Sequence, residues 1–244
     1  MNLRRSSWTA LLFITVALAC AARPLSAEVL RKNANIAGMS VYYVVVLPNG
    51  YDPAKTYPAV LAFPGGAQNM STVEGTLQGN WRVEAERRGY IVVIPAAPQG
   101  MVFFRGGEKI FPEFLTKLLG DYKILDNKFH IAGVSNGGIS AFHIAATYPE
   151  YFWSITGLPG LLPDPTDERV HAISKMCINM YVGELDENWN SRVKEQVAAL
   201  RQQGLNVQFS EEENQGHVMR TLEGPGSIRL FNQLEEARRH PCGK

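Results

Sequence analysis

A serine flanked by small residues is the strongest candidate for chemistry in this chain of 244 residues. Gly133-Val134-Ser135-Asn136-Gly137 has the pattern Gly-x-Ser-x-Gly, and it lies between an apolar segment and a segment with helical periodicity. In that context the serine occupies a tight turn from strand to helix, where large neighbours would collide with the adjoining elements. Its hydroxyl then projects above the sheet, so the pattern predicts that Ser135 is a nucleophile.

A serine hydroxyl is a weak nucleophile at neutral pH, and a histidine is the usual base that activates it. His217 lies in the segment Asn214-Gln215-Gly216-His217, which follows the last recognisable strand and precedes the last helix. This is the expected position of the base, and we predict that His217 fills it. The other four histidines lie inside a strand, inside a helix, in a proline-rich connection and near the C-terminus: His130, His143, His171 and His240.

The base needs a carboxylate that holds its tautomer and stabilises the imidazolium ion formed during proton transfer. Three candidates follow the apolar segment that ends at Val182, namely Glu184, Asp186 and Glu187. We predict Asp186, because a residue a few positions beyond the strand end can turn back toward His217. Glu184 or Glu187 could replace it, and otherwise they are solvated loop charges.

Two backbone N–H groups are expected to stabilise the oxyanion that forms during the reaction. The N–H of Asn136, directly after the nucleophile, is the first predicted donor. The second should come from the segment Pro64-Gly65-Gly66-Ala67-Gln68, which follows an apolar strand. Gly66 is the preferred residue there, and Ala67 is the alternative.

The elements that must position these residues alternate between apolar strands and helices. The predicted strands are Ser40–Leu47, Ala59–Phe63, Tyr90–Ile94, Phe129–Val134, Tyr151–Gly157, Cys177–Val182 and Val207–Phe209. The predicted helices are Trp81–Arg88, Phe111–Leu119, Ile139–Thr147, Arg192–Gln203 and Ser227–Arg238. Strands that are apolar throughout and alternate with helices favour an α/β fold, with a mostly parallel central sheet covered on both faces. We expect residues 28–244 to form a single domain of this kind.

The first 27 residues have the composition of a secretory signal peptide. Arg4 and Arg5 precede an uncharged apolar run that reaches Ala22, and small residues follow, with a preferred cleavage site after Ala27. An N-terminal membrane anchor, or a lipoprotein site at Cys20, is the alternative. The mature protein is therefore expected to be secreted or periplasmic, without a stable membrane span.

Charge and cysteine content indicate which binding partners and cross-links the protein can have. The chain has 24 basic and 23 acidic residues and no basic stripe, which argues against a nucleic-acid partner. After cleavage two cysteines remain, Cys177 and Cys242. They could form a disulfide in an oxidising compartment, although Cys177 lies in an apolar run and is equally compatible with a buried free thiol. The oligomeric state is left open.

The order Ser135, Asp186, His217 resembles that of the α/β-hydrolase superfamily over nearly the whole predicted mature chain. Leu47–Pro53 with Tyr57-Pro58, and Tyr148–Phe152, are similar to segments of secreted esterases such as polyhydroxybutyrate depolymerases and feruloyl esterases. The phospholipase/carboxylesterase and dienelactone-hydrolase groups are also similar. Pro64 stands where the oxyanion loop of the family usually has histidine, which leaves the subfamily open. The resemblance implies the α/β-hydrolase fold, a serine nucleophile and no metal or other cofactor.

We expect the substrate to be a small or polymer-derived ester, cleaved through an acyl-enzyme intermediate. Phe103, Phe104 and Trp189 could line an apolar acyl or aryl pocket, and Arg105 could meet a carboxylate. The two phenylalanines could equally be core residues. The short interval between Ser135 and Asp186 predicts no large lid. The alternatives are a peptidase of the same fold and a non-catalytic binding protein on a hydrolase scaffold.

Overall fold

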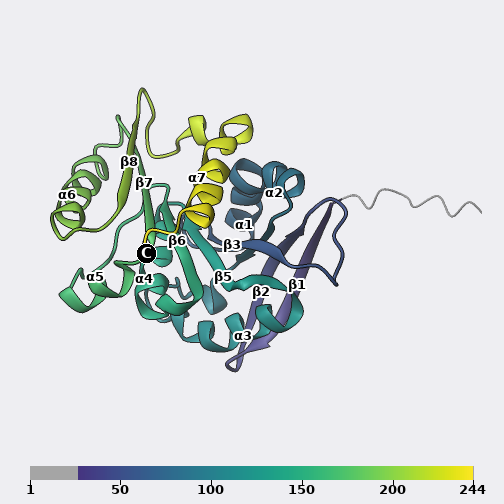
Figure 1. Ribbon diagram of the computed structural model, residues 1–244. Helices are drawn as coiled ribbons and strands as arrows, with labels where there is room; N and C mark the ends of the chain where they lie inside the picture. Colours follow the sequence, from purple (N-terminus) through teal and green to yellow (C-terminus); the bar gives the residue numbers. More distant parts are fainter. Residues whose placement is uncertain (1–26, 244) are drawn as a thin grey trace, which may run out of the picture.

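A central sheet organises the computed structural model, which describes residues 27–243. Eight strands in these residues pair in the order β1-β2-β4-β3-β5-β6-β7-β8. Neighbours from β4 to β8 are parallel, and β1 and β2 add antiparallel pairs at one end (Figure 1). The strands are β1 (Glu28–Ile36), β2 (Met39–Leu47), β3 (Tyr57–Phe63), β4 (Ile91–Pro95), β5 (Ile124–Gly133), β6 (Phe152–Gly157), β7 (Cys177–Gly183) and β8 (Val207–Glu212). The expected mostly parallel sheet is confirmed.

Helices cover both faces of the sheet. They are α1 (Met70–Thr76), α2 (Arg82–Arg88), α3 (Phe111–Asp121), α4 (Asn136–Thr147), α5 (Asp167–Ile173), α6 (Asn190–Gln202) and α7 (Ile228–Arg239). Helices α1, α2 and α7 pack on one hydrophobic cluster, and α3 to α6 pack on the other. The strands are apolar throughout because successive side chains enter these two clusters in turn, as Val44 and Val45 do.

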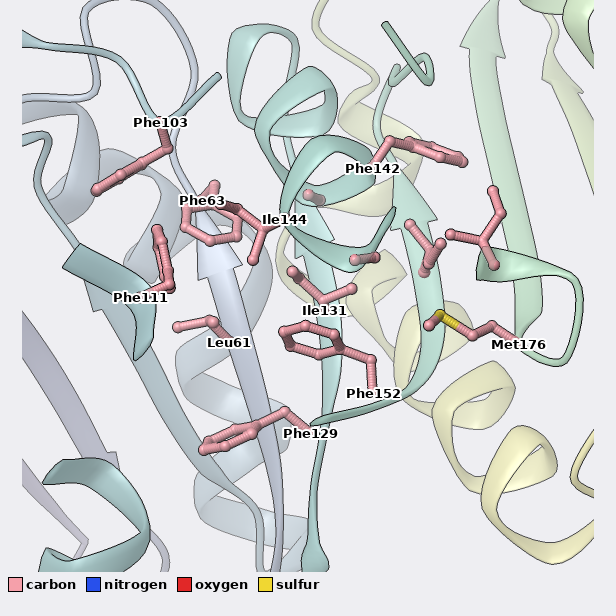
Figure 2. Close-up of a cluster of buried hydrophobic side chains, with 14 of the residues drawn as sticks. Leu61, Phe63, Phe103, Phe111, Phe129, Ile131, Phe142, Ile144, Phe152 and Met176 are labelled. Atoms are coloured by element: carbon pink, nitrogen blue, oxygen red, sulfur yellow. The ribbon is translucent and has the colours of Figure 1, made fainter. Parts of the chain in front are cut away.

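The larger cluster lies under α3 and α4 and is rich in aromatic side chains (Figure 2). Phe129 and Ile131 of β5 and Phe142 and Ile144 of α4 are all fully buried in this cluster. This packing fixes the position of α4 relative to β5, the strand that precedes it. Val134 and Ser135 are the two residues between β5 and α4, so the core determines where the serine lies.

Three elements were not predicted. Strand β1 is an edge strand in which only Ile36 is buried, so it lacks the apolar signal of a core strand. Helix α1 contains Gly75 and β-branched residues, and α5 is short. The predicted helix from Trp81 is preceded by a π-helical turn, Leu77–Trp81, that joins it to α1.

Two expectations concern the ends of the chain. The predicted signal peptide lies outside the described residues except for Ala27. A disulfide joins Cys177, at the start of β7, to Cys242 in the C-terminal segment, so the disulfide alternative holds and the free thiol does not. In residues 27–243 no helix is both long enough and apolar enough to span a bilayer.

Candidate active site

Ser135 lies on a strained turn between β5 and α4. Its backbone angles are φ 55° and ψ −117°, and α4 begins at the next residue. A Cβ on Gly133 would lie 2.0 Å from the carbonyl oxygen of Gly137, and one on Gly137 would lie 2.2 Å from that of Phe63. Only glycine fits at these two positions, which confirms the steric reason for the Gly-x-Ser-x-Gly pattern.

Ser135, His217 and Asp186 form a chain of hydrogen bonds at the carboxyl ends of β5, β7 and β8. The Nε2 atom of His217 is 2.8 Å from Oγ of Ser135, and its Nδ1 atom is 2.6 Å from Oδ2 of Asp186. A carboxylate only accepts, so Nδ1 carries the proton and Nε2 is free to accept the hydroxyl proton of Ser135. Asp186 is buried, with 5% of its surface exposed. The structure brings all three predicted side chains together.

The alternative carboxylates lie elsewhere. Glu184 is exposed, and its carboxylate accepts a hydrogen bond of 2.9 Å from the backbone N–H of Asn214. It therefore supports the loop that carries His217 without contacting the imidazole. Glu187 is exposed, as expected of a solvated loop charge.

Glu212 ties the histidine loop to α7, a role that the sequence analysis missed. This buried residue ends β8, and its carboxylate accepts two hydrogen bonds from Arg229, of 2.7 and 2.9 Å. The hydroxyls of Thr221 and Ser210 donate to it at 2.6 and 2.8 Å. Burial opposes the charge on Glu212, but these hydrogen bonds outweigh it and lower its pKa to about 2. Glu212 and Thr221 thus join the two ends of the loop around His217.

The predicted oxyanion loop lies beside the nucleophile. A Cβ on Gly65 would be 3.6 Å from Cβ of Ser135, and the amide Nδ2 of Asn136 donates to the carbonyl oxygen of Gly66 at 2.9 Å. Within residues 27–243, the N–H groups of Gly66 and Ala67 make no hydrogen bond to another backbone group. The N–H of Asn136 is in the first turn of α4 and has no partner within the helix. These donors are available to a bound oxyanion, and Gly66 and Ala67 both stay candidates.

Gln68 fastens this loop to the nucleophile helix. Its side chain is fully buried; the amide Nε2 donates to Oγ of Ser140 on α4 at 2.9 Å. Its Oε1 accepts a hydrogen bond of 2.9 Å from the backbone N–H of Phe103. One side chain therefore connects the oxyanion loop, α4 and the segment after β4. The sequence pattern gave no signal for this role, because all its partners are distant along the chain.

The predicted substrate-binding residues divide into two groups. Phe103 does not line a pocket, and the core alternative holds: its side chain is fully buried against Phe63 and Phe111, with ring centroids 5.2 and 5.3 Å away (Figure 2). Phe104 is half-buried and lines a groove of about 890 Å³. Trp189 is half-buried, and its ring centroid is 5.6 Å from that of His217.

Two other histidines have structural contacts. His130 is buried in β5, its Nδ1 atom is 2.8 Å from Oγ of Ser154, and burial lowers its pKa to about 3. His143 on α4 is hydrogen-bonded to Arg169 of α5 at 3.1 Å. Both residues hold elements together, as expected for histidines inside regular structure. Residues 27–243 contain no group of three or more His, Cys, Asp or Glu side chains arranged to hold a metal ion.

The sheet order and the strand–serine–helix turn define the α/β-hydrolase fold, and solved structures agree. A ferulic acid esterase is similar with a TM-score of 0.67 and 17% identity, over 88% of this chain and 99% of that one. A thermostable esterase is similar with a TM-score of 0.65 and 20% identity, over 86% of this chain and 61% of that one. At these low identities the structural similarity establishes the fold alone, and this fold agrees with the esterase-like resemblance of the sequence.

Sequence comparisons add a partial match. No family model matches the chain. Dipeptidyl-peptidase 5 of Porphyromonas gingivalis is 28% identical over 130 residues, which cover 48% of this chain. The match covers only 19% of that peptidase, so the chain corresponds to a small part of this relative. The relative and the structural neighbours together support a hydrolase.

Proposed function

We propose that the protein is a serine hydrolase that cleaves carboxylic esters through an acyl-enzyme intermediate. The observation that carries the proposal is the hydrogen-bonded series Ser135, His217 and Asp186, with distances of 2.8 and 2.6 Å. It lies beside backbone N–H groups that are free to bind an oxyanion. This combination matches the requirements of acyl transfer: an activated nucleophile, a base held in one tautomer and donors for the developing charge.

In the first half of the reaction, Oγ of Ser135 attacks the ester carbonyl carbon while its proton passes to Nε2 of His217. The carbonyl oxygen becomes an oxyanion that accepts hydrogen bonds from the N–H groups of Asn136 and Gly66. The carbon–oxygen bond to the alcohol then breaks, and the imidazolium gives its proton to the departing alcohol. Asp186 stabilises the imidazolium throughout.

In the second half, water replaces the alcohol. His217 takes a proton from the water, whose oxygen attacks the carbonyl carbon of the acyl-enzyme. The bond to Oγ of Ser135 then breaks, the serine regains its proton, and a carboxylic acid leaves. The indole of Trp189 lies against His217 on one side and restricts the directions from which a substrate reaches the imidazole.

Peptide hydrolysis is the second candidate, supported by the partial match to Dipeptidyl-peptidase 5. Amide and ester cleavage use the same groups, so the site alone does not separate them. The esterase neighbours, one of which matches over nearly its whole length, favour esters.

Turnover of p-nitrophenyl acetate and of aminoacyl p-nitroanilides by the purified protein tests this proposal. We expect hydrolysis of the ester, abolished in Ser135→Ala and unchanged in Ser174→Ala, a serine at the end of α5. Turnover of the amides alone would favour the peptidase. No turnover of either, together with no labelling by a fluorophosphonate, would favour a non-catalytic binding protein.

We also propose that the protein is exported by the N-terminal segment, residues 1–27. The support is its basic start followed by an uncharged apolar run. Cell fractionation with N-terminal sequencing tests this. A soluble exported protein that begins near Glu28 is expected, and a membrane-bound protein with an intact N-terminus would contradict the proposal.

A further inference from the structure

A groove of about 890 Å³ lies outside the residues that the mechanism uses. Helix α6 forms one wall, the segment Leu161–Pro165 forms another, and Phe104 and Arg105 close one side. Its volume is in the range of small-molecule binding sites, roughly 300–1,000 Å³. No step proposed above assigns a role to this groove.

The groove begins next to the catalytic residues. Ile139, which lines it, is one turn into α4, and its N–H donates to the carbonyl oxygen of Ser135 at 3.0 Å. Arg192 lines it from the first turn of α6, and its guanidinium lies 5.5 Å from the ring centroid of Trp189. Trp189 in turn lies against His217. The groove is therefore close to both catalytic residues: Ile139 is hydrogen-bonded directly to Ser135 through the backbone, and Arg192 is separated from His217 by Trp189 alone.

From there the groove runs along α6 and away from the catalytic edge of the sheet. The helix follows β7, which ends beside the catalytic loop, and it returns along the sheet to the start of the parallel strand β8. Its lining residues extend from Arg192 to Gln203. At the rise of an α-helix this is about 16 Å, with Ala199 about 10 Å beyond Arg192. Because Arg192 is at the end of the groove near the catalytic loop, we expect an acyl group on Ser135 to reach Ala199 only when it is long.

The groove is held open by a side chain that joins two of its walls. Gln196 of α6 accepts a hydrogen bond of 2.7 Å from the N–H of Leu162 and donates one of 3.0 Å to its carbonyl oxygen. Leu162 is therefore fixed against α6 without a ligand. A preformed site avoids part of the ordering cost of binding.

The lining indicates the chemical class of the occupant. Ile139, Leu161, Leu162, Val170, Ala199 and Leu200 provide apolar surface. Two arginines, Arg105 and Arg192, are balanced by two carboxylates, Asp164 and Glu195, so the lining has no net charge. A lining that is about equally apolar and polar and has no net charge favours an uncharged chain over an anionic or a cationic group.

We propose that this groove binds the acyl chain of the ester substrate, and that the enzyme prefers long, uncharged acyl groups. The proposal rests on the esterase function proposed above. The acyl group is the part bonded to Oγ of Ser135 in the intermediate, and Ile139, which lines the groove, lies on the helix that begins directly after that serine. Ala199 is then a residue that limits the length of chain the groove accepts.

The experiment compares p-nitrophenyl esters from acetate to decanoate, below the concentrations at which the long esters aggregate. In the wild type we expect kcat/KM to rise by at least about tenfold along the series, since each buried methylene group contributes to binding. Ala199→Trp places a large ring in the groove and should remove this rise. Ala198→Trp is the matched control, because Ala198 is also exposed on α6 but does not line the groove. In Ala198→Trp, kcat/KM should still rise from acetate to decanoate.

Each other outcome counts against the proposal. A flat series in the wild type, or the same loss of the rise in both tryptophan variants with their folds intact by circular dichroism, would overturn it. A second series, alkyl acetates of increasing alcohol length, tests the other part of the ester. If kcat/KM rises only in this series, and Ala199→Trp removes that rise, the groove binds the alcohol and the acyl assignment is overturned. Failure of the wild type to hydrolyse even the acetate ester would overturn the esterase function itself, together with this inference.

Discussion

The turn that carries Ser135 and the loop that carries His217 meet at one hydrogen bond of 2.8 Å, yet they are held in different ways. Around Ser135 the constraint is steric, because Gly133 and Gly137 lie too close to other backbone atoms for any Cβ. Around His217 a steric contact also exists, because a Cβ on Gly183 would lie 2.2 Å from the carbonyl oxygen of Gly216, but a polar constraint is added: the buried carboxylate of Glu212 ties the two ends of the loop together. Adding a single Cβ atom at such a glycine forces the backbone to move. Loss of a hydrogen bond to a carboxylate weakens the loop's attachment only in part, and the strength of this attachment depends on pH.

The steric constraint predicts the largest effect, in Gly137→Ala. The new Cβ would lie 2.2 Å from the carbonyl oxygen of Phe63, so β3 or α4 must move. We expect the free energy of unfolding to fall by at least about 3 kcal/mol, with loss of ester hydrolysis. Denaturant unfolding and the acetate assay measure both.

Gly120→Ala is the control for this substitution. A Cβ there meets nothing within 4 Å, and the residue lies in α3, where alanine is the better helix former. Unchanged activity and equal or greater stability are expected. If Gly137→Ala behaved in the same way, the steric account of the turn would be wrong.

The polar constraint predicts the next effect, in Glu212→Gln. The amide cannot accept both hydrogen bonds from Arg229, and its NH₂ group would face another donor. We expect the His217 loop to shift, lowering kcat for the acetate ester by about 10- to 100-fold with little change in KM. Steady-state kinetics, with circular dichroism to confirm folding, checks this.

Glu211→Gln is the matched control, because Glu211 is the preceding residue and is exposed. Its carboxylate pairs with Lys194 and Asn190 of α6 and makes no contact with the histidine loop. Its kcat should equal that of the wild type. If kcat fell equally in Glu212→Gln and Glu211→Gln, the loss of a negative charge would explain the effect, and the hydrogen bonds of Glu212 around the His217 loop would not.

The polar constraint also predicts a dependence of stability on pH. The pKa of Glu212 is lowered from 4.5 to about 2, so its ionised form stabilises the folded state above pH 4.5, and this contribution is lost as the pH falls toward 2. The difference in unfolding free energy between the wild type and Glu212→Gln should be greatest above pH 5 and shrink below pH 4. Denaturant unfolding between pH 6 and 2.5 measures it, and a difference independent of pH would contradict the assigned charge.

The smallest effect is expected in Asn136→Ala, which removes one side-chain hydrogen bond next to the nucleophile turn. The backbone N–H that we assign to the oxyanion site remains, and only the hydrogen bond from the side chain to Gly66 is lost. One such bond contributes about 0.5–1.5 kcal/mol, so kcat should fall by about tenfold or less. A loss as large as that in Ser135→Ala would show that the side chain, and not the backbone, carries the role.

The same comparison explains what the sequence could predict. The nucleophile turn was predictable because its glycines and serine act within five consecutive residues, and the apolar strands were predictable because both of their faces are buried. Asp186 was predictable from its place after β7, with Glu184 and Glu187 as alternatives that only the structure separates. Glu184 proved to hold the histidine loop at Asn214.

The missed features depend on partners distant in the chain. Gln68 bonds to Ser140, 72 residues away, and to Phe103, 35 residues away. The side chain of Phe103 is buried against Phe63, 40 residues away, and by composition alone it is equally suited to a pocket. Glu212 is recognisable only once α7 brings Arg229 beside it. Side-chain ties of this kind leave no local pattern.

Peptide mapping after reaction with a fluorophosphonate tests whether Ser135 is the nucleophile. We expect a single phosphonyl adduct on Ser135, with labelling slowed in Glu212→Gln and at the wild-type rate in Glu211→Gln. No adduct in the folded wild-type protein, or an adduct on another residue, would contradict it.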